Sequence, residues 1–338
     1  MLILAFRLCR LFPVRKNKVV LLRNFPVWGS LAALEEALRQ DGRFRVARAG
    51  RLSMFRLATA GAVFLNNNYS LLADLPFSKE TKLVQLWHGD GVLKRSGFSL
   101  EKNRGARMIP YTAVICGSEA VRPFLAQAFG LPEQRVLPLG SPRIDALVRP
   151  CDKRALRARF DERHPECRGK RLFLYAPTFR GDPARNAALL SHFDFGAFRA
   201  RFGDGAALLV RLHPRMHGAY DLRGTGAVDV TNEPDPADLL RVCERLITDY
   251  SSIMTDAAAL DLPVVLYAFD YDDYMAGDSG MYTDLKALPP GPVAEDFASL
   301  LEVLSLPDDS AAARAAFRAF HLGDVDGKSC ERIIERFL

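Results

Sequence analysis

Short runs of branched apolar residues alternate with longer helix-like stretches along this chain, and that alternation restricts the fold more than any other feature. The strand-like runs are residues 18–24, 44–49, 62–67, 83–89 and 112–118 in the first half, and 171–181, 206–214, 228–232, 245–252 and 263–269 in the second. Residues 30–40 and 118–130 have helical periodicity. Strands that alternate with helices form mainly parallel sheets. The pattern predicts an α/β protein with two Rossmann-like domains facing across a cleft.

The domain boundary is expected near the middle of the chain. Its 338 residues exceed one ordinary core and suit two domains of roughly 150 residues each. Charged residues dominate from Asp152 to Lys170, as in a surface helix at a domain junction. We therefore expect a short N-terminal helix in residues 1–16, a first domain in residues 17–150 and a second domain in residues 151–338.

The first sixteen residues combine apolar and basic side chains at helical spacing. The apolar residues of one face are Leu2, Ile3, Phe6 and Leu11, and the cations around them are Arg7, Arg10, Arg15 and Lys16. A short basic amphipathic helix can lie in a membrane interface, but it can equally pack on its own protein. No apolar run is long enough to span a bilayer, and no signal-peptide pattern precedes the domains, so we expect a cytoplasmic location.

Charge and cysteine usage exclude few partners. The net charge of +6 favours anionic partners, but the chain has no RNA-binding signature, zinc finger or long basic arm, so we expect no nucleic-acid partner. The six cysteines contain no CxxC pair and read as reduced thiols. His164 and Cys167 form only half of a metal site, and Pro214 argues against a zinc pair of His213 and His217. No metal ligands are predicted.

Polar residues that could bind a ligand or take part in a reaction cluster where predicted strands end. They are His88, Ser118, Thr178, Arg180, His213, Asp249, Ser251 and Ser252. A strand end holds a side chain rigidly, and ligands of such sheets bind beyond the carboxyl ends of the strands. A structural histidine would be the simpler interpretation of His88 alone. The repetition in both halves favours a functional site.

The segment that follows the strand 83–89 has its own pattern. Gly89 and Gly91 allow the chain to turn and leave backbone amides near His88. Asp90, Lys94 and Arg95 are the polar candidates on this loop, and the two cations could meet an acidic ligand. Solvated loop charges are the plainer alternative for both.

In the second half, residues 247–265 read as strand, tight turn, helix and strand. Ser251 and Ser252 fall at the helix start, where amides and the helix dipole can bind an anion such as a phosphate. Simple N-capping is the alternative and is compatible with anion binding. Arg180 offers a bidentate fork suited to phosphate, although a surface arginine would be as ordinary.

Several motifs together resemble the CDP-glycerol glycerophosphotransferase family, which includes teichoic acid primases and polymerases and related capsule enzymes. They are QLWHGDGVLKRSG, CGSE, LGSPRID, YAPTFRG, RLHP, ITDYSSIMTDAAALDLPVVLYAFDYDDY, PGP and DGKSCERIIE, in this order from about Pro13 onward. The resemblance implies a B-type glycosyltransferase fold with an acceptor-side first domain, a donor-binding second domain and no required metal or cofactor. It implies transfer of a polyol phosphate, glycerol phosphate in the first place, from CDP-glycerol or CDP-ribitol to a hydroxyl of a lipid-linked glycan, with release of CMP.

The resemblance also implies roles for individual residues. His88 of the WHG motif corresponds to the general base and His213 of the HP motif to a group near the donor phosphates. The donor diphosphate would meet Arg180, Ser251 and Ser252. The remaining candidates are Thr178, Asp249 and Ser118 on the donor side and Asp90, Lys94 and Arg95 on the acceptor side. Family members act at the cytoplasmic membrane face, which agrees with the basic N-terminal helix.

Three other functions remain open at the level of sequence. A nucleotide-sugar glycosyltransferase of the same fold would release a nucleoside diphosphate instead of CMP. A membrane-surface or nucleic-acid binding module would depend on residues 1–16 and not on His88. A metalloenzyme would need the pair His213 and His217.

Overall fold

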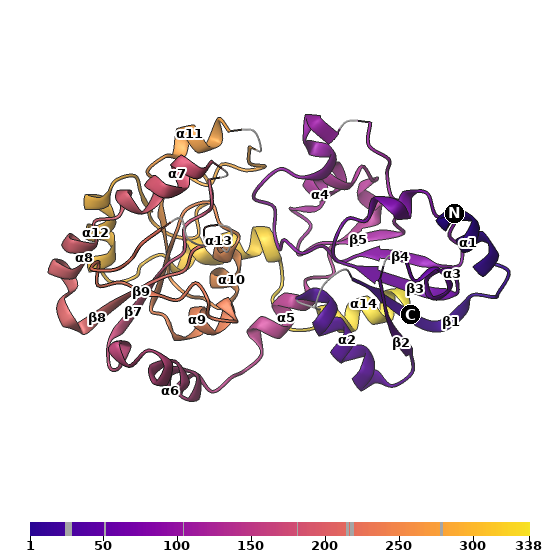
Figure 1. The fold of residues 1–338 in the computed structure, drawn as a ribbon, viewed down its shortest axis with the longest axis horizontal. Helices are drawn as coiled ribbons and strands as arrows, with labels where there is room; N and C mark the ends of the chain where they lie inside the picture. The colour runs from indigo at the N-terminus through magenta and orange to yellow at the C-terminus, as the bar shows by residue number, and fades with distance from the viewer. Residues whose placement is uncertain are drawn as a thin grey trace. The chain divides into compact units, whose positions relative to one another are not determined.

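The computed structural model describes residues 1–23, 29–50, 52–103, 105–180, 182–213, 216, 220–277 and 280–338. The chain forms two compact units. Unit 1 contains Met1–Arg149 and Ala319–Leu338, and unit 2 contains Pro150–Arg318. Each unit is built on one six-stranded sheet whose paired strands are all parallel (Figure 1). The predicted α/β class is therefore confirmed.

The sheet of unit 1 has the strand order β2-β1-β3-β4-β5-β6. Its strands are β1 (Arg15–Leu22), β2 (Arg45–Ala49), β3 (Ala60–Leu65), β4 (Lys82–Gln85), β5 (Ala113–Ile115) and β6 (Val136–Leu137). All six residues of β3 are buried, because helices cover both faces of a parallel sheet. Strand β2 lies on one side of β1, whereas β3 and the strands after it lie on the other side. The reversal point of this sheet is therefore between β1 and β3.

The main helices of unit 1 are α1 (Leu2–Cys9), α2 (Ser30–Asp41), α3 (Met54–Ala58), α4 (Arg122–Phe129), α5 (Pro142–Val148) and α14 (Ser329–Phe337). Short 3₁₀ turns lie at Ser70–Ala73, Gly97–Ser99, Glu101–Asn103 and Glu133–Arg135. The expected helix at residues 30–40 is confirmed as α2. Ser141 caps α5, since its hydroxyl oxygen accepts from the amide of Ile144.

The sheet of unit 2 has the strand order β12-β11-β10-β7-β8-β9. Its strands are β7 (Arg171–Tyr175), β8 (Ala206–Val210), β9 (Val228–Asp229), β10 (Arg245–Thr248), β11 (Val264–Tyr267) and β12 (Val293–Ala294). Counted from β7, this is the order of the dinucleotide-binding Rossmann fold. The order reverses between β7 and β10, and ligands of such sheets bind beyond the strands at this reversal.

The helices of unit 2 are α6 (Lys153–Arg163), α7 (Pro183–Ala188), α8 (Phe195–Phe202), α9 (Pro236–Val242), α10 (Ile253–Ala259), α11 (Tyr271–Met275) and α12 (Phe297–Ser305). Shorter 3₁₀ turns lie at Pro165–Cys167, Leu189–His192 and Gly203–Gly205. The helix α13 (Ala311–Leu322) begins in unit 2, and its last four residues belong to unit 1.

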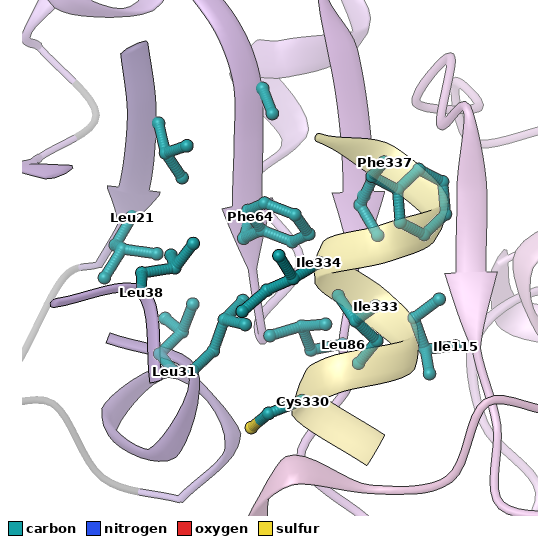
Figure 2. Close-up of a cluster of buried hydrophobic side chains, with 14 of the residues drawn as sticks. Leu21, Leu31, Leu38, Phe64, Leu86, Ile115, Cys330, Ile333, Ile334 and Phe337 are labelled. Atoms are coloured by element: carbon teal, nitrogen blue, oxygen red, sulfur yellow. The ribbon is translucent and has the colours of Figure 1, made fainter. Parts of the chain in front are cut away.

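The C-terminal segment differs from the sequence-based domain boundary. Residues 151–338 were expected to form one domain, but residues 319–338 belong to unit 1. Ile333, Ile334 and Phe337 of α14 pack into the buried cluster under the unit 1 sheet, beside Phe64 and Ile115 (Figure 2). The apolar face of α14 is thus part of the first core, although it lies at the far end of the chain.

The predicted strands are also longer than the observed ones at their carboxyl ends. The run 83–89 ends as a strand at Gln85, 171–181 ends at Tyr175, and 245–252 ends at Thr248. In each case the polar residues that follow have left the sheet and form a loop. The short strand β12 had no counterpart among the predicted strands, because two residues carry no periodic signal.

No helix in the described part of the chain is both long and apolar enough to span a membrane.

Candidate active site

His88 lies on a loop three residues after the end of β4, and β4 pairs with β3, one of the two strands at the reversal point of the unit 1 sheet. Its side chain is exposed. The Nδ1 atom lies 2.8 Å from the carbonyl oxygen of Asn66, which follows β3. Because a carbonyl oxygen can only accept, Nδ1 carries the proton of this bond. In the neutral ring Nε2 is then the unprotonated nitrogen, and it can accept a proton from a ligand.

Trp87 holds the start of this loop in an uncommon conformation. Its φ angle is +58°, in the left-handed region that bulky residues rarely adopt. The Trp87 amide donates to Oε1 of the buried Gln85 at 2.9 Å, and its ring meets Phe129 edge-to-face with a centroid distance of 5.0 Å. Gln85 in turn donates to the hydroxyl of Tyr111. These contacts fix the backbone that carries His88, as is common for strained residues at functional sites.

The far side of the same loop is held by the end of α13. The Val92 amide donates to Nδ1 of His321 at 3.2 Å, and His321 is fully buried. Burial lowers the pKa of His321 to about 4, so the ring stays neutral and Nδ1 remains an acceptor near neutral pH. Gly91 has φ +75°, and a Cβ atom there would lie 2.8 Å from Nδ1 of His321. Only glycine fits between the loop and this histidine.

The acceptor-side candidates have different surroundings. Asp90 forms an ion pair with Arg143 of α5, with Nε of Arg143 at 2.5 Å from Oδ2. It therefore contributes to holding the loop. Lys94 and Arg95 are exposed. Their side chains lie on the segment that follows Val92.

Ser118 is buried in unit 1 and bound by its own protein. Its hydroxyl donates to the carbonyl oxygen of Phe320 and accepts from the amide of Val121 at 3.4 Å. A Cβ atom at the neighbouring Gly117 would lie 2.6 Å from the carbonyl oxygen of His321. The end of α13 thus packs tightly against the loop after β5 as well as the loop after β4.

In unit 2, the loops after β7 and β10 flank the reversal point of the sheet, and Asp249 joins them. This carboxylate is buried and accepts from the backbone amides of Thr178 and Tyr250 at 2.7 and 2.6 Å. The Thr178 side chain is buried, and its hydroxyl oxygen has no hydrogen-bond partner among the described residues. Asp249 is therefore an organiser of the two loops.

Arg180 lies at the centre of this cluster, with a side chain that is only 4% exposed. All three guanidinium nitrogens donate to the protein: Nε and Nη2 to Asp270 at 2.7 and 3.0 Å, Nη2 to Asp249 at 2.7 Å, and Nη1 to the Thr178 carbonyl at 2.6 Å. Tyr250 donates its hydroxyl to the same Asp270. Burial favours the neutral guanidine, but the carboxylates of Asp249 and Asp270 outweigh it and raise the pKa of Arg180.

Ser251 and Ser252 precede α10 on the loop after β10. Ser252 is exposed and Ser251 is half-buried. The Ser251 hydroxyl oxygen accepts from the Ile253 amide at 3.4 Å. Ser252 is the N-cap residue of α10, but its side chain makes no capping hydrogen bond, and the Ser251 hydroxyl instead accepts from the first amide of the helix.

His213 follows β8 and is exposed, with its ring 5.5 Å from that of Phe179. Pro214 and His217, which entered the argument on a zinc pair, lie outside the described residues. His164, considered as half of a metal site, contacts Glu233 through Nε2 at 2.8 Å. Among the described residues no group of three histidine, cysteine or acidic side chains could hold a metal ion.

Comparison with known proteins gives these loops a context. The family model described as CDP-Glycerol:Poly(glycerophosphate) glycerophosphotransferase matches residues 26–338. The chain belongs to this family. The resemblance that the sequence motifs indicated is thereby confirmed.

Two curated relatives are similar over most of this chain. The teichoic acid ribitol-phosphate primase of Bacillus spizizenii is 29% identical over 97% of this chain and 92% of its own length. The teichoic acid ribitol-phosphate polymerase TarK of Staphylococcus aureus is 29% identical over 83% of this chain, which spans 57% of that relative. The chain thus matches nearly the whole of the first relative and little more than half of the second.

A structure of the wall teichoic acid polymerase TagF has the same fold. It matches with a TM-score of 0.75 at 22% identity, over 98% of this chain and 91% of that chain. The two-domain B-type glycosyltransferase architecture expected from the motifs is confirmed at the level of fold.

Sequence reasoning missed three residues that build the site. Asp270 binds Arg180 from ninety residues away, Asn66 orients His88, and His321 supports Val92 from the opposite end of the chain. Asp270 falls within the FDYDDY stretch of the family motif, so it could have been singled out there. His321 stands outside every motif and left no local signal.

Proposed function

We propose that this protein transfers a polyol phosphate from a CDP-activated donor to a hydroxyl of a lipid-linked glycan or polyol-phosphate acceptor, with release of CMP. The family match over residues 26–338 supports the reaction class. The observation that carries the chemistry is the bond from Nδ1 of His88 to the Asn66 carbonyl, which leaves Nε2 as a proton acceptor. The family description names a glycerol donor and the two relatives a ribitol phosphate, so both donors belong in the test.

In the proposed step, Nε2 of His88 takes the proton of the attacking acceptor hydroxyl. The acceptor oxygen forms a bond to the phosphorus that carries the polyol, and the bond from that phosphorus to the bridging oxygen breaks. CMP leaves with the bridging oxygen. Such a general base contributes typically about 10²–10⁴ in rate. Trp87, Gln85 and His321 are proposed to position the His88 loop and to take no part in proton transfer.

We assign the donor diphosphate to the loops at the reversal point of the unit 2 sheet. Ser252 is exposed there, and Ser251 and Thr178 lie on the same loops. His213 is exposed on the loop after the neighbouring strand β8. Hydroxyl, imidazole and backbone donors are the groups that stabilise charge on a phosphoryl group in transfer. Arg180 is proposed to act differently from the sequence expectation. Since its nitrogens already bind Asp249, Asp270 and the Thr178 carbonyl, it positions these loops rather than contacting the donor.

Membrane association is the further part of the proposal. In α1, Phe6 is buried and packs on Phe77, while Leu4 and Leu8 are 62% and 58% exposed. Leu11, just after the helix, is 81% exposed. An exposed apolar helix face flanked by arginines suits a peripheral position at the inner face of the cell membrane, where lipid-linked acceptors are found.

The test is acceptor-dependent release of the nucleotide. Purified protein is incubated with CDP-glycerol or CDP-ribitol and with a crude bacterial lipid-linked glycan fraction, and CMP is quantified with and without acceptor. CMP release that requires the acceptor supports the proposal, and the preferred donor identifies the polyol. Release of a nucleoside diphosphate from a nucleotide sugar, with none from either CDP-polyol, would support a glycosyltransferase of the same fold instead.

A further inference from the structure

A basic depression opens on unit 1 at the β2 edge of its sheet. It has a volume of about 540 Å³ and is lined by Lys18, Arg39, Val46, Ala47, Arg48, Phe55 and Arg56. These residues come from β1, α2, β2 and α3. The edge strand β2 forms one wall. Four of the seven lining residues are cations.

The positive charge of this depression is only partly balanced by the contacts around it. Arg39 and Arg48 share one carboxylate, that of the buried Glu35, at 2.7 and 2.8 Å. Lys18 and Arg56 donate to neutral oxygens: Lys18 to the Thr59 hydroxyl at 2.6 Å and Arg56 to the Arg48 carbonyl at 2.5 Å.

The pKa of Lys18 lies below its ordinary value, first because of burial and then because of neighbouring cations. Burial lowers the pKa of Lys18, and the charges of Arg15 and Arg56 lower it further. A bound anion would relieve this repulsion.

The rim of the depression is apolar on one side. Phe55 is partly exposed, the Lys18 ammonium lies 5.5 Å from its ring centroid, and Phe12 meets it edge-to-face at 5.2 Å. Phe12 follows α1, and α1 packs against α3. The exposed Phe12 therefore places the end of the α1 segment at the rim of the cationic depression.

We infer that the depression binds the phosphate of an anionic membrane lipid, so that α1, Phe55 and the four cations form one membrane-docking face. An anionic lipid surface suits both features. Its acyl chains accept exposed apolar side chains, and its headgroup phosphates attract clustered lysines and arginines. A free phosphate ion would account for the cations alone and leave the exposed side chains of Phe12 and Phe55 beside them without a role. The inference rests on the membrane association proposed above and specifies its headgroup site.

The test compares vesicle binding of the full-length chain and two matched double variants. Vesicles of phosphatidylcholine alone and of phosphatidylcholine with phosphatidylglycerol are titrated, and bound protein is measured by co-sedimentation. Lys18→Gln/Arg56→Gln should bind the anionic vesicles roughly 25-fold more weakly, since each surface cation contributes about fivefold. Lys153→Gln/Arg154→Gln removes two exposed cations that line a second basic depression, in unit 2, and should bind like the unaltered protein.

A further variant separates this inference from the proposal beneath it. Leu4→Ser/Leu8→Ser should lose binding to both kinds of vesicle. If the unaltered protein binds neither kind, the proposed membrane association fails. If it binds and the leucine variant does not, while Lys18→Gln/Arg56→Gln binds anionic vesicles normally, only the headgroup site is overturned.

A third titration decides the source of the phosphate. Inorganic phosphate is titrated calorimetrically into the unaltered protein and into Lys18→Gln/Arg56→Gln. We expect no difference in phosphate binding between the two proteins. Phosphate binding that this variant abolishes, together with unchanged vesicle binding, would assign the depression to a free anion and overturn the lipid assignment. Unchanged thermal unfolding midpoints of all variants establish that the comparisons concern folded protein.

Discussion

The loop after β4 in unit 1 and the loop after β7 in unit 2 each follow an interior strand of a parallel sheet, yet they present their key residues in opposite ways. His88 is exposed and bound by one carbonyl oxygen, so one ring nitrogen remains available. Arg180 is buried, and two carboxylates and a carbonyl bind its guanidinium. The loop after β4 thus presents a reactive group in His88, whereas Arg180 stabilises the loop after β7 through its contacts.

This contrast shows that a position beyond a strand end predicts a functional loop but not the role of a residue on it. The number of protein partners and the burial of the side chain decide the role. A buried residue whose nitrogens all bind the protein supports the loop, and an exposed residue with an unengaged donor or acceptor can meet the ligand.

Removal of Arg180 should produce the largest effect on stability. Arg180→Met leaves two carboxylates without their shared cation, and breaking a buried pair in this way costs about 3–5 kcal/mol of unfolding free energy. The measurement is urea unfolding followed by a probe in unit 2. Arg171→Met, which breaks an exposed pair with Glu244, should cost less than about 1 kcal/mol. Equal losses in the two variants would remove the structural role of Arg180 and restore it as a candidate donor ligand.

The buried His321 should make unit 1 sensitive to mild acid. Its folded pKa of about 4 lies below the ordinary value of 6.5, so the unfolded chain binds more protons between these values and stability falls as the pH drops through this window. The loss amounts to roughly 3 kcal/mol by pH 4. The measurement is the unfolding free energy in urea at pH 7 and at pH 4. The decrease between the two pH values should be roughly 3 kcal/mol larger in the unaltered protein than in His321→Asn. Parallel losses in both proteins would contradict it, because all other titrating groups are common to them.

The same histidine tests whether the His88 loop depends on support from α13. Asparagine can place an oxygen near the position of Nδ1 and keep the bond from the Val92 amide, whereas alanine cannot. We expect His321→Ala to lower kcat roughly 10- to 100-fold with little change in KM, as misplacement of a catalytic group does. His321→Asn should recover most of that loss. Alanine and asparagine variants with the same kcat would show that the hydrogen bond does not position the loop.

The regular parts of the molecule were predictable, and the long-range contacts were not. The strands β1, β3, β7 and β10 follow from apolar runs that any parallel sheet requires, and the site loops follow from their ends. The contacts of Arg180 with Asp270 and of Val92 with His321 join distant segments, so no local pattern encodes them. The placement of α14 in unit 1 escaped prediction for the same reason: its amphipathic face fits any core until the tertiary fold selects one.

The smallest expected effect concerns Ser252 at the start of α10. Ser252→Ala removes one exposed hydroxyl from the proposed diphosphate site, and the loss of one such hydrogen bond weakens donor binding by about 0.5–1.5 kcal/mol. Calorimetric titration with CDP-glycerol measures it. Ser191→Ala, at an exposed serine of the same unit, serves as the control. An unchanged affinity in Ser252→Ala would exclude this hydroxyl from the donor site.

The most direct test of the account is the acceptor-dependent CMP release of His88→Asn beside that of the unaltered protein. The assignment of Nε2 as the proton acceptor predicts a rate about 10²–10⁴-fold lower at saturating donor, with donor affinity preserved because the donor is assigned to unit 2. A rate within a few-fold of the unaltered protein would contradict the account, since Nε2 of His88, which the proposed step uses as the proton acceptor, would then have no part in the reaction.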